Sequence, residues 1–83
     1  MPMPREILAE GVKAYETGVA TGLYVLGEKD IRVLAQADLY RLVMIGEAGC
    51  SEKVRVEAGQ KLMELRETKQ YKVAEDKLFV NRK

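Results

Sequence analysis

The sequence predicts a mainly α-helical fold: a small three-helix domain that contains a helical hairpin. Apolar residues recur with the 3.6-residue period of a helix in the three segments 4–26, 31–45 and 51–66. Glycines interrupt this period between the segments, where the chain must turn. These observations favour helices that pack on one another, and each element can be justified in turn.

The length of 83 residues predicts one helical domain, residues 1–83, with a frayed N-terminus at 1–3 and a C-terminal extension at 67–83. A chain this short buries only about 60–65% of its surface on folding. Because 47% of the residues are hydrophobic, some apolar surface is expected to remain for a partner or for a second copy of the chain.

The N-terminal segment begins at Pro4, which suits the first turn of a helix. Its apolar residues keep helical spacing: Leu8, Val12, Tyr15, Val19, Leu23 and Leu26. An adjacent line, which would let a second backbone approach closely, consists of Gly11, Gly18 and Gly22. In the alternative interpretation the helix ends at 17–18 and a new element begins at 21–22.

Residues 22–34 are compatible with either a hairpin or two helices. Two β-prone runs, 23–26 and 31–34, surround a polar turn, which is typical of a β-hairpin. We favour the alternative, in which the first helix ends at Gly27 and Asp30 caps the second helix.

The segment 31–45 is apolar on nearly all sides. Its strongly polar residues are only Arg32, Gln36, Asp38 and Arg41. Such a helix lies either in the middle of a fold or inside an oligomer. Because this chain has few other helices to cover it, we predict a homo-oligomer, at least a dimer. The predicted oligomer interface is Val33, Ala37, Tyr40 and Met44.

The clearest helix spans residues 51–66. Ser51 is expected to cap it, and Glu52 places negative charge in the first turn, where the helix dipole favours it. The stripe expected to face the core is Val54, Ala58, Leu62 and Leu65. A second, narrower strip holds Val56, Gly59 and Met63.

Gly59 weakens this helix by about 1 kcal/mol relative to alanine, so its presence needs a reason. In one interpretation a neighbouring helix packs closely on Gly59, with Arg55 and Arg66 along the edge. In the other, bare backbone between two guanidiniums forms a contact face for phosphate or carboxylate. The predicted partner-binding residues are then Arg55, Gly59, Met63 and Arg66.

Two shorter segments complete the chain. Residues 46–49 form a glycine-containing joint, as in a helical hairpin or a helix-turn-helix. Cys50, next to it, is expected to be a small buried apolar residue rather than a reactive thiol. Near the C-terminus, the runs 71–73 and 78–80 flank a polar segment and predict either a short β-hairpin or a short fourth helix.

Composition argues against several functions. The net charge is only +1; residues 1–50 carry five Lys/Arg and seven Asp/Glu, and residues 51–83 carry nine and six. One cysteine cannot form an intramolecular disulfide, and without histidine neither a zinc site of the usual type nor a histidine triad can be built. We therefore predict no enzyme, no cofactor and no metal.

The same sequence favours a cytoplasmic location without membrane contact. No apolar run approaches 18 residues, and the N-terminal residues lack the pattern of a signal peptide. If a bacteriophage encodes the chain, this cytoplasm is that of the bacterial host cell.

Residues 35–66, AQADLYRLVMIGEAGCSEKVRVEAGQKLMELR, resemble a helical module of bacteriophage small-terminase and related helix-turn-helix DNA-packaging proteins. The residues that match are Ser51, Lys53, Val54, Arg55, Ala58, Leu62 and Met63. The resemblance implies a helix, a short turn and a second helix. It implies a phage origin, although a long oligomerisation segment is missing and the chain is only weakly basic.

Two functions follow as hypotheses. The first is a small non-enzymatic protein-interaction module that self-associates and binds or inhibits a partner protein through helical surfaces. The second is a small helix-turn-helix DNA-binding protein of phage DNA packaging or regulation, with residues 71–80 as a wing. In the second, the predicted nucleic-acid contacts are Lys53, Arg55, Lys61 and Arg66. The near-neutral charge favours the first.

Overall fold

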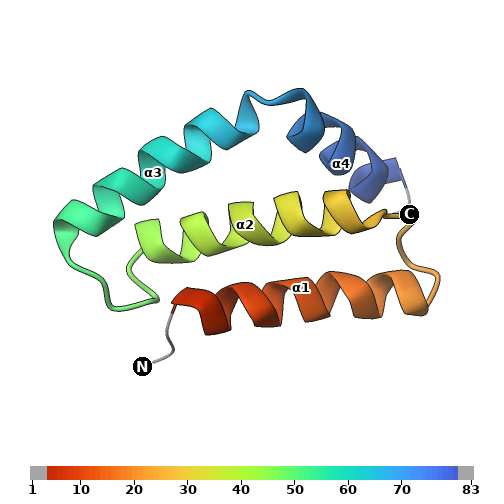
Figure 1. The fold of residues 1–83 in the computed structure, drawn as a ribbon, viewed down its shortest axis with the longest axis horizontal. Helices are drawn as coiled ribbons and strands as arrows, with labels where there is room; N and C mark the ends of the chain where they lie inside the picture. The colour runs from red at the N-terminus through yellow and green to blue at the C-terminus, as the bar shows by residue number, and fades with distance from the viewer. Residues whose placement is uncertain (1–3, 81–83) are drawn as a thin grey trace.

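The computed structural model describes residues 4–80, so the end predicted to fray at 1–3 lies outside the described residues. The described chain forms four helices: α1 (Pro4–Ala20), α2 (Glu28–Met44), α3 (Glu52–Arg66) and α4 (Lys69–Val80). The helices α1, α2 and α3 run in alternating directions, and α4 turns back over the N-terminal half of α2 (Figure 1). The prediction of a mainly α-helical fold is confirmed.

The number of helices differs from the prediction, because the C-terminal extension is itself a helix. The Thr68 hydroxyl accepts a hydrogen bond from the backbone N–H of Tyr71 at 3.2 Å and so caps the start of α4. Tyr71 and Leu78, one from each β-prone run, then lie on one helical face with Ala74: Tyr71 and Ala74 are buried and Leu78 is half-buried. Within residues 4–80 no hairpin is present, neither at 22–34, where it was the alternative not favoured, nor near the C-terminus.

The turn from α1 to α2 also differs from the prediction. α1 continues past Gly18 but ends at Ala20 and not at the predicted Gly27, because the chain turns at Gly22, whose φ is +77°. The carbonyl of Gly18 accepts the N–H groups of Leu23 and Tyr24 at 2.8 and 3.1 Å. α2 begins directly after its N-cap Gly27, which lies three residues before the predicted cap. Asp30 still stabilises the start of α2, but as the third residue of the helix and not as its cap. Its carboxylate accepts the backbone N–H of Gly27 at 2.9 Å.

Two of the glycines on α1 have separate packing roles. A Cβ placed on Gly11 would lie 3.5 Å from the Cβ of Ala35, so α1 and α2 approach closely at this point. A Cβ on Gly18 would collide with the ring of Tyr24, which covers it. The glycine line predicted for close approach therefore contacts α2 at Gly11 and the α1–α2 loop at Gly18.

α2 is the central helix of the fold. It contacts each of the other three helices, with α1 on one side and α3 and α4 on the other (Figure 1). Apolar residues from nearly its whole circumference are buried: Ile31, Val33, Leu34, Ala35, Ala37, Leu39 and Val43. The chain itself therefore covers α2, which is the first of the two arrangements that its apolar sequence allowed.

α3 contributes a narrower buried face than its sequence predicted. The predicted Ser51 cap is present, with the hydroxyl accepting the Val54 N–H at 3.4 Å. Ala58 and Leu62 are buried and Leu65 is half-buried. Val54 stays 42% exposed, because the first turn of α3 extends past the end of α2 (Figure 1).

An ion pair ties α4 to the start of α2. The ammonium of Lys77 donates to the Asp30 carboxylate at 2.8 Å, and Asp30 is only 7% exposed. The Lys77 hydrogen bond, with that of the Gly27 N–H, holds the pKa of Asp30 below its ordinary 3.8, although burial opposes this shift. The stabilisation is therefore complete above about pH 4 and is lost as the pH falls through the folded-state pKa.

We expect Asp30→Asn to lower the melting temperature at pH 7 and to lessen the loss of stability below about pH 4, because the titrating carboxylate is gone. Thermal melts of the variant and the wild type across this pH range measure both effects. Glu28→Gln is the control, since it removes the exposed pair with Arg32 at 2.9 Å and should change stability little. An acid dependence identical to that of the wild type would contradict the role of Asp30.

Leu62 tests the packing of α3, because it is only 3% exposed in the cluster that α2 and α4 share. Leu62→Ala leaves a cavity and should lower the free energy of unfolding by about 2–5 kcal/mol in denaturant titrations. The neighbouring Met63 is 68% exposed, so Met63→Ala should stay within about 0.5 kcal/mol of the wild type. Equal effects of the two changes would show that the orientation of α3 is wrong.

Candidate functional site

Three hollows lie along α3, and two of them, one on each side of the helix, adjoin its N-terminal half. The first is a groove toward α2 with a cavity of about 150 Å³, lined by Leu39, Tyr40, Val43, Cys50, Val54, Glu57, Ala58 and Lys61. The second is an open hollow of about 280 Å³, lined by Met44, Glu52, Arg55, Val56 and Gly59. They differ in the residues that surround them.

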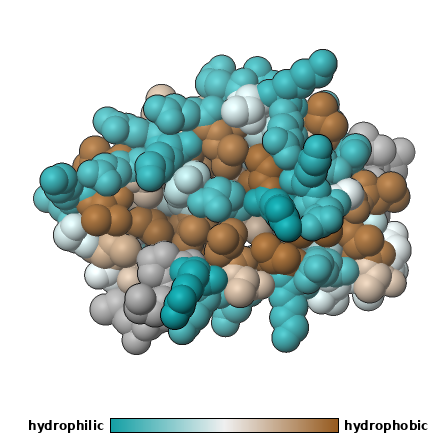
Figure 2. Space-filling view, in the orientation of Figure 1, coloured by the Kyte–Doolittle hydropathy of each residue, from teal (hydrophilic) through white to brown (hydrophobic). Residues whose placement is uncertain are grey.

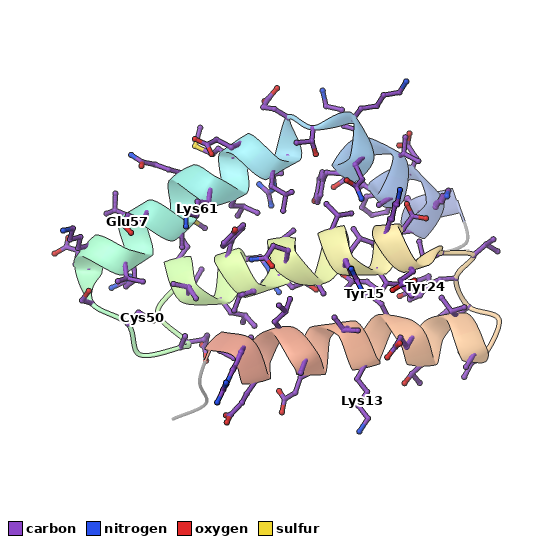
Figure 3. The ribbon with its side chains drawn as sticks, in the orientation of Figure 1. Lys13, Tyr15, Tyr24, Cys50, Glu57 and Lys61 are labelled. Carbon is purple, nitrogen blue, oxygen red and sulfur yellow. The ribbon has the colours of Figure 1, made fainter. Side chains whose placement is uncertain are left out.

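The groove is lined mainly by apolar residues and lies over the packed contact between α2 and α3. In the view of Figure 2, hydrophobic residues form a band along α2, below the hydrophilic side chains of α3. Within the groove, Leu39, Val43 and Ala58 are each less than a tenth exposed. Cys50 is half-buried, with its thiol 4.0 Å from the Ala48 carbonyl oxygen, and the charged Glu57 and Lys61 line the same groove (Figure 3). The apolar residues of the groove are therefore mostly ones that the fold itself packs, and Val54, which is 42% exposed, is the most exposed of them.

The second hollow belongs to a larger apolar surface. Met44, Val56 and Met63 are 36, 56 and 68% exposed. On α3 the spacing between residues 52, 56, 59, 63 and 66 alternates between four and three, which places them on one line of the helix. We call this surface the outer face; it consists of Glu52, Val56, Gly59, Met63 and Arg66 on α3 and Met44 at the end of α2.

Gly59 is where the two helices meet on the outer face. A Cβ placed on Gly59 would lie 3.2 Å from the sulfur of Met44, so the Met44 side chain rests against bare α3 backbone. This contact matches the interpretation in which α2 packs closely on Gly59. It also joins two sets of predicted site residues, because Met44 comes from the predicted oligomer interface and Gly59 from the predicted partner-binding set.

Arg55 is engaged with its own chain. Its Nε donates to the carbonyl oxygen of Met44 at 3.2 Å, and its guanidinium covers Gly46, whose φ of +91° ends α2. A basic group suits the negative end of a helix dipole. Arg55 therefore fixes the end of α2 beside the outer face, and its partner lies on α2 and not within its own helix.

Arg66 lies at the opposite end of the outer face, where α3 meets α4. Its guanidinium forms a hydrogen bond with the hydroxyl of Tyr71. That hydroxyl donates to a carboxylate oxygen of Glu75 at 2.9 Å. Burial and Glu75 raise the pKa of Tyr71, and the Arg66 guanidinium partly opposes them. The Arg66 residue as a whole remains exposed.

The predicted nucleic-acid contacts do not share one side of α3. Arg55 lines the hollow beside Met44, whereas Lys61 lines the groove on the other side together with Glu57. Lys53 lies two positions before Arg55, which places the two side chains about 200° apart around the helix. The four basic residues therefore form no continuous basic stripe.

The predicted oligomer interface divides into buried and accessible residues. Val33 and Ala37 are 7 and 6% exposed and lie in the core of the single chain. Tyr40 is half-buried and Met44 lies on the outer face.

Glu52 and Val56 were not predicted site residues, although the spacing of residues 52–66 would have placed both beside Gly59 and Met63.

A hydrogen bond between two half-buried side chains, Tyr15 and Asp38, connects the first two helices. The Tyr15 hydroxyl donates to Asp38 at 2.9 Å and so joins α1 to α2. Burial, together with Asp38, raises the pKa of Tyr15, and its ring lies 6.2 Å from that of Tyr24 (Figure 3). This arrangement keeps the hydroxyl protonated and hydrogen-bonded, as a structural link requires.

No family model, curated protein or solved structure matches the chain. Among residues 4–80 no helix is long and apolar enough to cross a membrane. The same residues contain no group of three or more metal-ligating side chains of the kind that holds an ion.

Proposed function

We propose that this chain is a small non-enzymatic protein-interaction module that binds a protein through the outer face of α3. The observation that carries the proposal is the exposure of Met44, Val56 and Met63 around the bare backbone of Gly59. Contiguous exposed apolar residues mark interaction surfaces, and methionine and arginine are enriched in protein interfaces.

The outer face suits a helical partner. Val56 and Met63 lie on one line of a 15-residue helix, and the Met44 side chain from α2 fills the space over Gly59 between them. The Arg55 bond to the Met44 carbonyl fixes the two helices that form the face. A surface held in place in this way loses little conformational entropy on binding.

The distribution of charge favours a protein partner over DNA. Acidic Glu52, Glu57 and Glu64 are interspersed with the basic residues of α3, whereas DNA binding draws on a concentrated basic surface. Seven residues, 45–51, separate α2 from α3, against the three or four of a typical helix-turn-helix. The two helices also run in opposite directions side by side (Figure 1).

We expect Met63→Glu to leave the fold intact and to abolish binding of the partner, because a charge would be buried at the centre of the contact. Affinity capture from the cells that make the protein, followed by mass spectrometry, would compare this variant with the wild type. Val25→Glu is the matched control, since Val25 is also 68% exposed but lies in the α1–α2 loop.

Proteins retained by the wild type and by the Val25→Glu control, but lost with Met63→Glu, would support the outer face as the binding surface. Circular dichroism on all three proteins checks that the helices are unchanged. An identical set of captured proteins with Met63→Glu would contradict the proposal.

A further inference from the structure

The outer face is complementary to a second copy of itself. In α3, Glu52 and Arg66 each lie seven residues from Gly59, on the same line of the helix. If two copies of α3 pack in opposite directions with a two-fold axis at Gly59, Glu52 of each copy meets Arg66 of the other. A two-fold interface pairs each residue with its counterpart in this way, so both ends would carry an attractive contact.

The apolar residues fit the same arrangement. Val56 and Met63 lie three and four residues on either side of Gly59, so the Val56 side chain of one copy lies beside Met63 of the other. Gly59 has no side chain at the centre, and the Met44 side chain of the same chain lies over it. The two copies therefore meet at the centre through their Met44 side chains. The alternating spacing of four and three residues is that of a coiled-coil seam.

The charged ends of the outer face have no ion-pair partner within the part of the chain that the structure describes. Neither Glu52 nor Arg66 forms an ion pair with another residue of the range 4–80. Both are exposed. Fourteen residues separate them, about 21 Å along the axis at 1.5 Å per residue, so the two contacts would lie at opposite ends of the helix pair.

We propose that the occupant of the outer face is a second copy of this chain, with α3 packed antiparallel on α3 about a two-fold axis at Gly59. This inference rests on the proposed function, because it names the partner of the same face. Three exposed apolar side chains per copy make a small interface, below the size of most permanent dimers. The dimer therefore forms reversibly, with a dissociation constant in the micromolar range or weaker.

A charge exchange tests the arrangement. Glu52→Arg alone, or Arg66→Glu alone, places like charges together at both ends and should raise the dissociation constant at least about tenfold. Glu52→Arg combined with Arg66→Glu restores opposite charges and should return it to within about threefold of the wild type. Sedimentation equilibrium measures the constant for each protein.

Glu57→Arg is the matched control, because Glu57 is exposed on the groove side of the same helix; it should change the constant less than about twofold. Circular dichroism accompanies each variant, since Glu52 lies in the first turn of α3 and Arg66 contacts Tyr71. Weakening by each single change with recovery in the combined variant supports the antiparallel pair.

Two results would overturn the proposed antiparallel pairing of two α3 helices. One is a wild-type chain that remains monomeric at about 1 mM. The other is a dimer that the combined variant does not restore although both single variants remain helical. Neither result affects the proposed function, which fails separately if Met63→Glu retains every captured protein.

Discussion

The burial of α2 is the constraint on which the rest of the structure depends. Its buried residues point to nearly all sides, so one neighbouring helix cannot cover it. α1 covers one side, and α3 and α4 share the other. The fourth helix is therefore essential: Ala74 of α4 is fully buried, and Lys77 reaches back to Asp30 at the start of α2.

The way in which α3 and α4 share the covering of α2 explains why part of the α3 surface remains exposed to solvent. Because α3 shares the covering of α2 with α4, it buries only Ala58 and Leu62 fully. Val56 and Met63 then face solvent, although they are as apolar as the residues that pack inside. The hydrogen bond from Arg55 to the carbonyl of Met44 holds the end of α2 against α3. The fold thus produces and fixes the outer face through the same contacts that stabilise it.

Periodicity predicted the helical class, the Ser51 cap and the buried positions Ala58 and Leu62, because each depends on spacing within one helix. It could not decide the state of residues 71–80, since Tyr71, Ala74 and Leu78 form a helical face only with α2 beneath them. The hydrogen bond of Arg55 could not be predicted, for a related reason. Its partner, the Met44 carbonyl, belongs to another helix, and intrahelical spacing cannot reveal it. The oligomer prediction used Val33 and Ala37, which the chain's own helices cover.

The central claim is that α2 is covered within one chain and that the outer face of α3 is covered by a partner, which we propose is a second copy. A dilution series of amide NMR spectra tests both parts in one measurement. We expect concentration-dependent shifts at residues 52–66 on the outer face and at Met44, with Val33 and Ala37 unchanged. Shifts centred on Val33 and Ala37, or spectra independent of concentration up to about 1 mM, would contradict the account.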